Sequence, residues 1–190
     1  MVLFVKDGLS TPLFVAVTRF VLLISLTVGM ARAEESLEYK IKAAYLYNFT
    51  KFITWPALQG TTFNICLVGG DPFQDLLDSL EAKTVQDKPI RIFRYDNIKQ
   101  VKNCQLVYLD NTDIRINEAI PNALLVANLS NSLTVSSQPF FAESGGMIGF
   151  ALEQEKVKLH INLKVLKQSG LGISAKLIEV STVVGEDEHE

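Results

Sequence analysis

Residues that build metal centres are scarce in this sequence. Among its 190 residues are two cysteines, Cys66 and Cys104, and two histidines, His160 and His189. His189 belongs to an acidic terminus that we expect to be solvated, which leaves His160 as the one histidine of the folded part. Because a structural zinc ion is held by a full set of cysteine and histidine ligands, the sequence predicts no metal site and no bound cofactor.

Motifs for nucleotide, phosphate or ester chemistry are also missing. The sequence has no G-x-G-x-x-G run, no Walker lysine with its Ser/Thr, and no G-x-S-x-G nucleophile elbow. Basic residues form no cluster and the formal net charge is −3. A nucleic-acid partner is therefore not expected, because neutralising phosphates requires concentrated positive charge. A catalytic pair of carboxylates has no characteristic spacing in the sequence, because such pairs assemble in three dimensions. The sequence therefore neither indicates nor excludes an enzyme.

The N-terminal hydrophobic run is too short to cross a bilayer comfortably. It covers residues 20–30 after Arg19, whereas a spanning helix needs about 20 apolar residues. Ala31-Arg32-Ala33 follows with the small-x-small pattern of a signal-peptidase site, and no cysteine stands there to carry a lipid. We predict a signal peptide over residues 1–33 and an exported protein. The alternative is an uncleaved anchor, lengthened by the apolar residues 13–17.

Residues 34–184 are expected to form one domain, followed by an acidic tail over residues 185–190. The composition is 48% hydrophobic, enough for one core, and neither a repeat nor a linker divides the chain. Residues 63–70, apolar on both faces and closed by Gly69-Gly70, predict the central strand. Further strands are expected over residues 90–95, 104–109, 122–127, 133–135 (a short edge strand), 147–153 and 156–162, and helical segments over residues 72–82, 96–101, 112–120 and 163–169. Residues 174–180 are expected to form either a last short helix or an extended cover.

The alternation of strands and helices predicts the fold class. It is α/β, a single-domain, mostly parallel three-layer sheet with helices on both faces and a C-terminal antiparallel hairpin. In such sheets the first and third strands are often neighbours, as in the flavodoxin-like order, which places Cys66 and Cys104 on adjacent strands. In an oxidising compartment the pair predicts one disulfide. The alternative is two separate buried thiols.

An aromatic helix is expected ahead of the central strand, capped by Ser36 and ended by Trp55-Pro56. Its apolar residues recur at three- and four-residue steps, as in a helix with one buried face. They are Leu37, Ile41, Ala44, Tyr45, Phe49 and Phe52. The plain interpretation packs this stripe across the sheet. A second interpretation turns part of it toward a partner, because aromatic residues anchor interfaces.

Two features are candidate sites. The turn over residues 69–72 can bind an anion at a helix start, although a structural turn explains it better because the carboxylate of Asp71 would repel a phosphate. On the strand over residues 156–162, Lys158, His160 and Asn162 share one face. They predict either an ordinary half-polar strand face or a small polar pocket, in which the neighbouring lysine favours a neutral His160.

Three blocks of the sequence stand out together. The first is residues 42–56, an aromatic run that ends in Trp55-Pro56. The second combines residues 65–73 with residues 104–108. The third comprises Leu133-Thr-Val-Ser136, Gly145-Gly-Met-Ile148, Leu159-His-Ile-Asn-Leu163, Ser169-Gly-Leu171, Ile173-Ser174 and Leu177. In this combination the chain resembles the YfiR family of periplasmic regulators over nearly all of its length after residue 33.

The resemblance implies a periplasmic α/β protein without catalysis of its own. It would repress a YfiN-like membrane diguanylate cyclase by binding the periplasmic domain of that enzyme, and an outer-membrane lipoprotein of the YfiB type would sequester it. The resemblance also implies a homodimer, and Cys66 and Cys104 match one of the two cystine pairs of the member that gives the family its name.

The candidate ligand or partner contacts are Lys158, His160, Asn162, Phe140 and Phe141. Two other classes of function stay open. One is a periplasmic small-molecule-binding protein or enzyme that uses the Lys158/His160 face. The other is a structural accessory of an outer-membrane complex.

Overall fold

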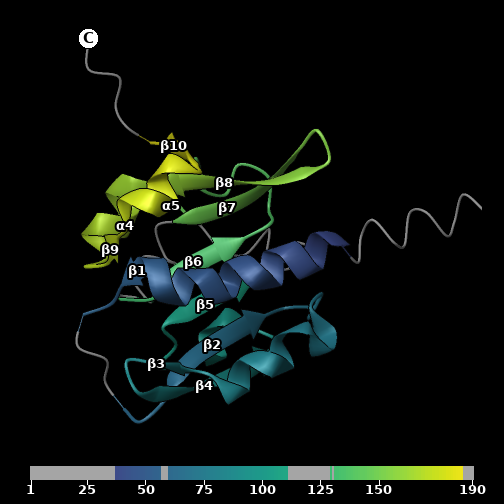
Figure 1. Cartoon of the computed structure of the whole chain (residues 1–190), viewed down its shortest axis with the longest axis vertical. Helices are drawn as coiled ribbons and strands as arrows, with labels where there is room; N and C mark the ends of the chain where they lie inside the picture. Colours follow the sequence, from purple (N-terminus) through teal and green to yellow (C-terminus); the bar gives the residue numbers. More distant parts are fainter. Residues whose placement is uncertain (1–36, 57–59, 111–128, 130, 186–190) are drawn as a thin grey trace, which may run out of the picture. The chain divides into compact units, whose positions relative to one another are not determined.

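A curled, mostly parallel sheet of eight strands organises the protein in the computed structural model (Figure 1). The structure describes residues 37–56, 60–110, 129 and 131–185. Those from Glu38 onward belong to one compact unit. The predictions that fall outside the described residues are the signal peptide, the Ser36 cap, the helix over residues 112–120, the strand over residues 122–127 and the tail after Gly185.

The described part of the chain begins with a helix over residues 37–52, hereafter the first helix. The further elements are β1 (Ile53–Thr54), β2 (Phe63–Val68), η1 (Gln74–Ala82), β3 (Thr84–Val85), β4 (Lys88–Tyr95), η2 (Ile98–Gln100), β5 (Leu106–Leu109), β6 (Leu133–Ser136), β7 (Ile148–Glu153), β8 (Lys156–Asn162), α4 (Leu163–Gln168), β9 (Gly172–Ile173), α5 (Ala175–Glu179) and β10 (Thr182–Val184). β1 and β9 form a separate two-stranded sheet.

The large sheet has the strand order β10-β8-β7-β6-β5-β2-β4-β3. β2 pairs in parallel with both β4 and β5, and the pairs β5–β6, β6–β7 and β8–β10 are parallel as well. β7 and β8 form an antiparallel hairpin, and β3 pairs antiparallel with β4. The order β4-β2-β5 places the first and third strands of the α/β part side by side, as in flavodoxin-like sheets. The predicted fold class is confirmed.

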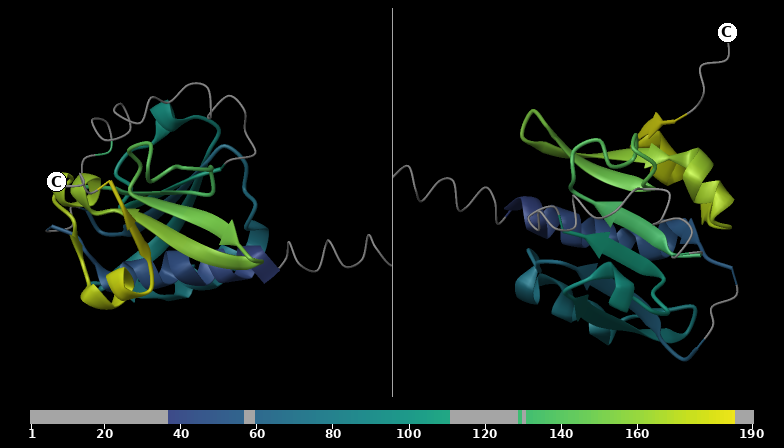
Figure 2. Two further views of the ribbon diagram at one scale, coloured as in Figure 1. Left: turned by 90° about the horizontal axis from the view of Figure 1, so that it is seen from above. Right: turned by 180° about the vertical axis from the view of Figure 1, so that it is seen from behind.

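Side chains of β2 alternate between two apolar clusters of the core. Ile65 and Leu67 belong to the larger cluster, which includes the buried residues of the first helix. Cys66 and Val68 belong to the smaller cluster. Figure 2 shows the first helix and α5 on one side of the sheet and η2 on the other. Burial from both sides explains why this strand is apolar at consecutive positions, as in other parallel sheets.

The prediction of an edge strand over residues 133–135 is wrong. β6 lies between β5 and β7, and all of its residues are buried. The two polar side chains of β6 are satisfied internally: Ser136 Oγ donates to the carbonyl of Leu109 (2.9 Å) and Thr134 Oγ1 accepts the N–H of Met147 (3.2 Å). Hydroxyl groups that find such partners can be buried at little cost.

The predicted buried face of the first helix is also partly wrong. Leu37 and Ile41 of the predicted stripe are 58% and 38% exposed and Ala44 is exposed, whereas Leu46, which lies outside the stripe, is fully buried. Phe49 is fully buried as predicted, and its ring stacks on Phe150 of β7 with centroids 6.1 Å apart. In the part of the chain that the structure describes, no helix combines the length and apolar character needed to cross a membrane.

Turn residues in the C-terminal third act as their chemistry predicts. Gln154 and Glu155 both have positive φ, 49° and 61°, which is the type I′ geometry favoured in two-residue hairpins. Gly170 (φ 78°) follows the end of α4 in the left-handed conformation typical of helix C-caps. Ser174 caps α5 by accepting the N–H of Lys176 (3.3 Å). The predicted hairpin and the short helix α4 are confirmed, and α5 shows that the helix is the correct alternative for residues 174–180.

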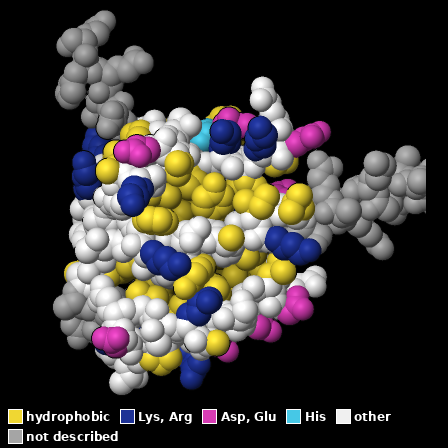
Figure 3. Space-filling view, in the orientation of Figure 1, with side chains coloured by type: hydrophobic (Ala, Val, Ile, Leu, Met, Phe, Trp, Pro, Cys, Tyr) yellow, Lys and Arg dark blue, Asp and Glu magenta, His cyan; other side chains and the backbone are white. Residues whose placement is uncertain are grey.

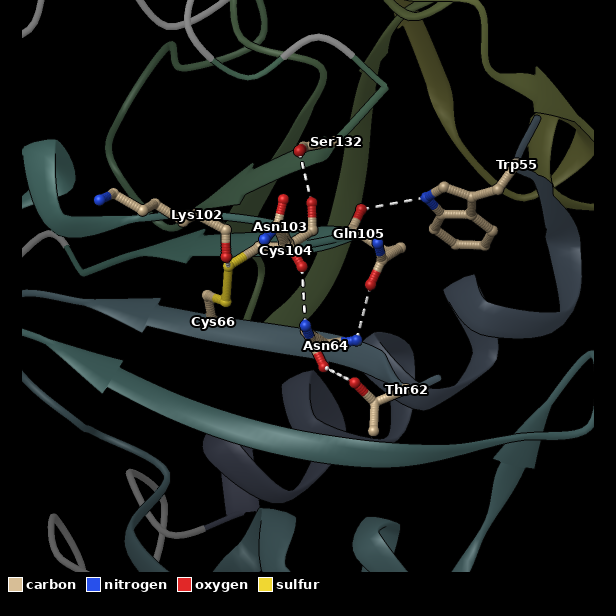
Figure 4. The surroundings of a disulfide bond; sticks show 9 residues. All are labelled: Trp55, Thr62, Asn64, Cys66, Lys102, Asn103, Cys104, Gln105 and Ser132. Carbon is tan, nitrogen blue, oxygen red and sulfur yellow. Dashed lines mark hydrogen bonds between the residues drawn. A yellow bond between two sulfur atoms is a disulfide. The ribbon is translucent and has the colours of Figure 1, made fainter. Parts of the chain in front are cut away.

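Trp55 closes the core where the first helix ends. Its side chain is 4% exposed, and its Nε1–H donates to the carbonyl of Gln105 at 3.0 Å (Figure 4). The ring meets Phe63 of β2 edge to face, with centroids 5.0 Å apart. Trp55 therefore ties the end of the first helix to both β2 and the residue ahead of β5.

Replacing Trp55 with Phe should destabilise the protein, because it removes the hydrogen bond from the indole N–H to the carbonyl of Gln105, which keeps the backbone N–H of Leu133 (2.8 Å) as its other donor. We expect the free energy of unfolding to fall by about 0.5–1.5 kcal/mol. Urea unfolding followed by circular dichroism measures the change. A midpoint equal to that of the wild type would show that the hydrogen bond contributes nothing.

Candidate functional site

One disulfide joins β2 to the residues ahead of β5 (Figure 4). Cys66 and Cys104 are bonded through their sulfurs, with Cα atoms 6.0 Å apart. Asn64 Nδ2 donates to the carbonyl of Asn103 (2.7 Å), and Ser132 Oγ donates to that of Cys104 (2.5 Å). The predicted disulfide is confirmed. Parallel pairing of β2 with β5 brings the two cysteines together, as the strand order required.

The disulfide belongs to the smaller apolar cluster together with Phe141. This cluster contains Cys66, Val68, Cys104, Val107, Leu109, Leu129 and Phe141. Phe141 is 3% exposed, and its ring lies so close to Gly146 that a Cβ added there would be 2.2 Å from Cε1. Phe141 therefore anchors the segment 137–145, hereafter the Phe140 loop, beside the disulfide.

A cleft of about 500 Å³ opens between the first helix, the Phe140 loop and the β7–β8 hairpin. Its lining includes Lys42, Phe140, Phe150, Leu152 and His160. Figure 3 shows hydrophobic side chains gathered between the first helix and the hairpin, with the histidine of the described part at their margin beside charged side chains. The cleft thus combines an apolar wall with a charged one.

His160 is held between two carboxylates that come from different elements. Its Nδ1 lies 2.6 Å from Glu143 Oε1 in the Phe140 loop, and its Nε2 lies 3.0 Å from Glu153 Oε1 at the end of β7. Burial alone lowers the pKa of His160, but the hydrogen bonds and charges of the two carboxylates raise it on balance. The expected bias of His160 toward its neutral form by Lys158 is not seen in the direction of this pKa, which is raised by Glu143 and Glu153.

Lys42 is the second cation of the cleft, and it is 4% exposed. It forms an ion pair with Glu38 one turn earlier on the first helix. Its Nζ lies 4.9 Å from the ring centroid of Tyr39 and 5.8 Å from that of Phe150. A buried ammonium needs such compensation. Each cation of the cleft thus has a carboxylate partner.

Of the other predicted site residues, Phe140 lines the cleft, whereas Phe141, Lys158 and Asn162 do not. Phe140 is 74% exposed and lines the cleft, whereas the adjacent Phe141 is buried beside the disulfide. Lys158 is exposed. Asn162 is buried, caps α4 through its Oδ1 and donates from Nδ2 to the Phe140 loop. The structure therefore brings His160 and Phe140 into one cleft and gives Asn162 a structural role.

Sequence reasoning missed four charged residues of the cleft. Glu38 and Lys42 stand at i and i+4 on a helix, a spacing that favours ion pairs and was readable from the sequence. Glu143 and Glu153 had no such signal, because their contact with His160 depends on how the Phe140 loop folds over the hairpin.

In the turn after β2, the N–H groups of Phe73 and Gln74 are already occupied by a side chain of the protein. The carboxylate of Asp71 accepts the N–H groups of Phe73 and Gln74, both at 3.0 Å. Arg94 Nε also donates to Asp71, at 2.5 Å, and this hydrogen bond raises the pKa of the guanidinium. Asp71 thus occupies the position that an anion would take, which agrees with a structural turn. η1 begins at Gln74, two residues later than the predicted helix.

Within the described ranges, no group of three or more His, Cys, Asp or Glu side chains is arranged to hold a metal ion. The fold and the cleft define a disulfide-linked α/β domain whose concave surface carries compensated charges and an exposed aromatic residue, features typical of a binding protein. The family profile described as YfiR/HmsC-like matches residues 39–182. The chain belongs to this family, and membership indicates a periplasmic regulator of cyclic-di-GMP signalling.

Other comparisons add little. No curated protein matches the sequence significantly. One solved structure that matches is the ABC domain in complex with L-Trp from Streptococcus pneumonia, with 12% identity and a TM-score of 0.45. The match covers 68% of this chain and 57% of that one, a similarity too low to bear on fold or function.

Proposed function

We propose that this protein represses a YfiN-like membrane diguanylate cyclase by binding its periplasmic domain, and that a YfiB-like outer-membrane lipoprotein sequesters it. The family match over residues 39–182 carries the proposal. No chemical step is required, because a repressor that binds the inactive state of the cyclase more tightly than the active state shifts the population between them. A homodimer is part of the same proposal.

The rim of the cleft offers a surface for such a partner. Phe140 (74% exposed) and Leu152 (60% exposed) both line the cleft. Phe140 also has a positive φ of 57°, a conformation that is unfavourable for an aromatic residue and that tends to persist where it serves a function. Exposed aromatic side chains beside a concave surface commonly dominate binding energy. We therefore place the partner contact at this rim.

A matched pair of neighbouring variants tests the contact. Phe140→Ala should leave the free energy of unfolding within about 0.5 kcal/mol of the wild type, because the side chain is exposed. The same change should weaken binding to the purified periplasmic domain of the cyclase by about tenfold or more. Phe141→Ala should instead cost about 3–5 kcal/mol of stability, because it empties a buried site. Full-affinity binding by Phe140→Ala would move the contact elsewhere.

A cellular experiment tests the function itself. Deleting the gene should raise intracellular cyclic-di-GMP, and expression of the full chain should restore the original level. The effect should vanish in a strain that also lacks the cyclase. Unchanged cyclic-di-GMP in the single deletion would contradict the proposal.

The cleft also supports a second candidate, a receptor for a small periplasmic molecule. Its volume of about 500 Å³ is within the range of ligand sites. Calorimetry against periplasmic metabolites, with wild type and His160→Ala, separates the two. Heat that disappears in the variant favours the receptor, and cyclase binding that survives in the variant favours the regulator.

Export is a further part of the proposal. The protein recovered from the periplasm should begin at Glu34, which N-terminal sequencing or intact mass would show. A chain that retains residues 1–33 in the membrane fraction would support the uncleaved anchor instead.

A further inference from the structure

Both ring nitrogens of His160 face a carboxylate oxygen. Nδ1 lies 2.6 Å from Glu143 and Nε2 lies 3.0 Å from Glu153. A neutral imidazole carries one N–H, so it can donate to one of the two carboxylates while its other nitrogen presents a lone pair to the second. An imidazolium donates to both. Simultaneous hydrogen bonds to Glu143 and Glu153, with both carboxylates ionised, therefore require the protonated ring.

The two contacts join three separate parts of the fold. His160 is in β8, Glu153 ends β7, and Glu143 belongs to the Phe140 loop. The hairpin is already closed by its own ladder of backbone pairs. The contact with Glu143 is different, because it fastens the loop to the hairpin across the wall of the cleft. Its loss would therefore affect the loop more than the hairpin.

The other charged groups near the ring are few. Lys158 lies on the same face of β8 and is exposed. Across the cleft, the first helix contributes Glu38 and Lys42, which pair with each other. On its other side β8 pairs with β10, where Thr182 lies opposite His160. The raised pKa of His160 traces to Glu143 and Glu153 among the charged groups, so these two decide its protonation.

We propose that His160 is an acid-closed latch that fastens the Phe140 loop to the β7–β8 hairpin and so fixes the wall of the cleft. The protonated ring holds both carboxylates. Deprotonation removes the hydrogen bond to one carboxylate and leaves a nitrogen lone pair facing the oxygen of that carboxylate. The latch is complete below the ordinary pKa of histidine, about 6.5, and opens as the pH rises through the raised pKa of the folded protein. The effect on partner binding rests on the proposed function, whereas the latch itself does not.

The chain is well suited to a direct test, because its only other histidine is His189. In the full chain with His189→Asn, the remaining imidazole can be titrated by NMR. We expect a pKa above 6.5, lowered by Glu143→Gln and also by Glu153→Gln. Glu155→Gln removes a carboxylate from the same hairpin without touching His160 and is the matched control, expected to leave the pKa nearly unchanged.

Hydrogen exchange reports on the loop. After correction for intrinsic rates, protection of residues 140–146 should fall about tenfold between pH 5.5 and pH 8.5 in the wild type, the scale of one charge-assisted hydrogen bond. In His160→Gln the protection should not depend on pH. A titration at or below pH 6.5, equal effects of all three Gln variants, or pH-independent protection in the wild type would each overturn the latch. These measurements need no partner, so failure of cyclase binding would leave them unaffected.

Discussion

Without the Cys66–Cys104 disulfide, the protein should lose about 4 kcal/mol of its free energy of unfolding in the chain-entropy model. The bond links residues 38 positions apart, and cross-linking them removes conformations from the unfolded chain. Domains of this kind have a total stability of about 5–15 kcal/mol. The unlinked protein should therefore be marginally stable, and a substantial fraction could unfold under mild conditions.

Urea unfolding of Cys66→Ala/Cys104→Ala measures the effect, with Trp55 as the single tryptophan reporter. Reduction of the wild type should give a similar loss, whereas reductant should have no effect on the double variant. Under the proposed function, reduction lowers the folded fraction and releases the cyclase. If reductant leaves both the midpoint and the inhibition unchanged, the disulfide has no regulatory part.

Gly146→Ala should destabilise the protein by overpacking. The new Cβ would lie 2.2 Å from Cε1 of Phe141, far inside van der Waals contact. The ring is buried in the disulfide cluster and has little room to move. Overpacking of this kind costs about 1–3 kcal/mol, and a shift of Phe141 would also displace the Phe140 loop.

Gly149→Ala is the matched control for this prediction. Gly149 is also buried, but a Cβ there would meet its nearest atom, the backbone N of Ala142, at 3.5 Å. We expect its stability to stay within about 0.5 kcal/mol of the wild type. Thermal unfolding of the two variants gives the comparison. Equal losses would show that the cost comes from replacing a buried glycine and not from Phe141.

The predictions of neighbouring strands, of the disulfide and of the hairpin turn were correct, because each depends on short stretches of sequence. The double-sided apolar character of β2 indicated a central strand, and the order of elements then placed β5 beside it. The disulfide followed, because two cysteines near adjacent strands lie within bonding distance. The hairpin turn at Gln154 and Glu155 was equally local, since loop length selects turn geometry.

Predictions failed where the outcome depended on distant contacts. Leu37, Ile41 and Ala44 of the first helix are exposed although they fit its apolar periodicity, because burial depends on the elements that pack against the helix and not on spacing alone. β6 was predicted at an edge but lies between β5 and β7, a position that depends on how β7 packs back against the sheet. The two carboxylates that raise the pKa of His160 were missed because neither of them lies in its own strand.

The sequence by itself determined the alternation of strands and helices, the neighbouring positions of Cys66 and Cys104, and the C-terminal hairpin. Periodicity, turn chemistry and handedness act over short stretches of chain, so they can be read one segment at a time. Only the tertiary structure decided the face that the first helix buries, the cleft, and the contacts of His160 with Glu143 and Glu153. All three depend on side chains that are far apart in the sequence and meet only in the folded protein. The electrostatic energies of such contacts vary with distance and burial, which no local sequence pattern encodes.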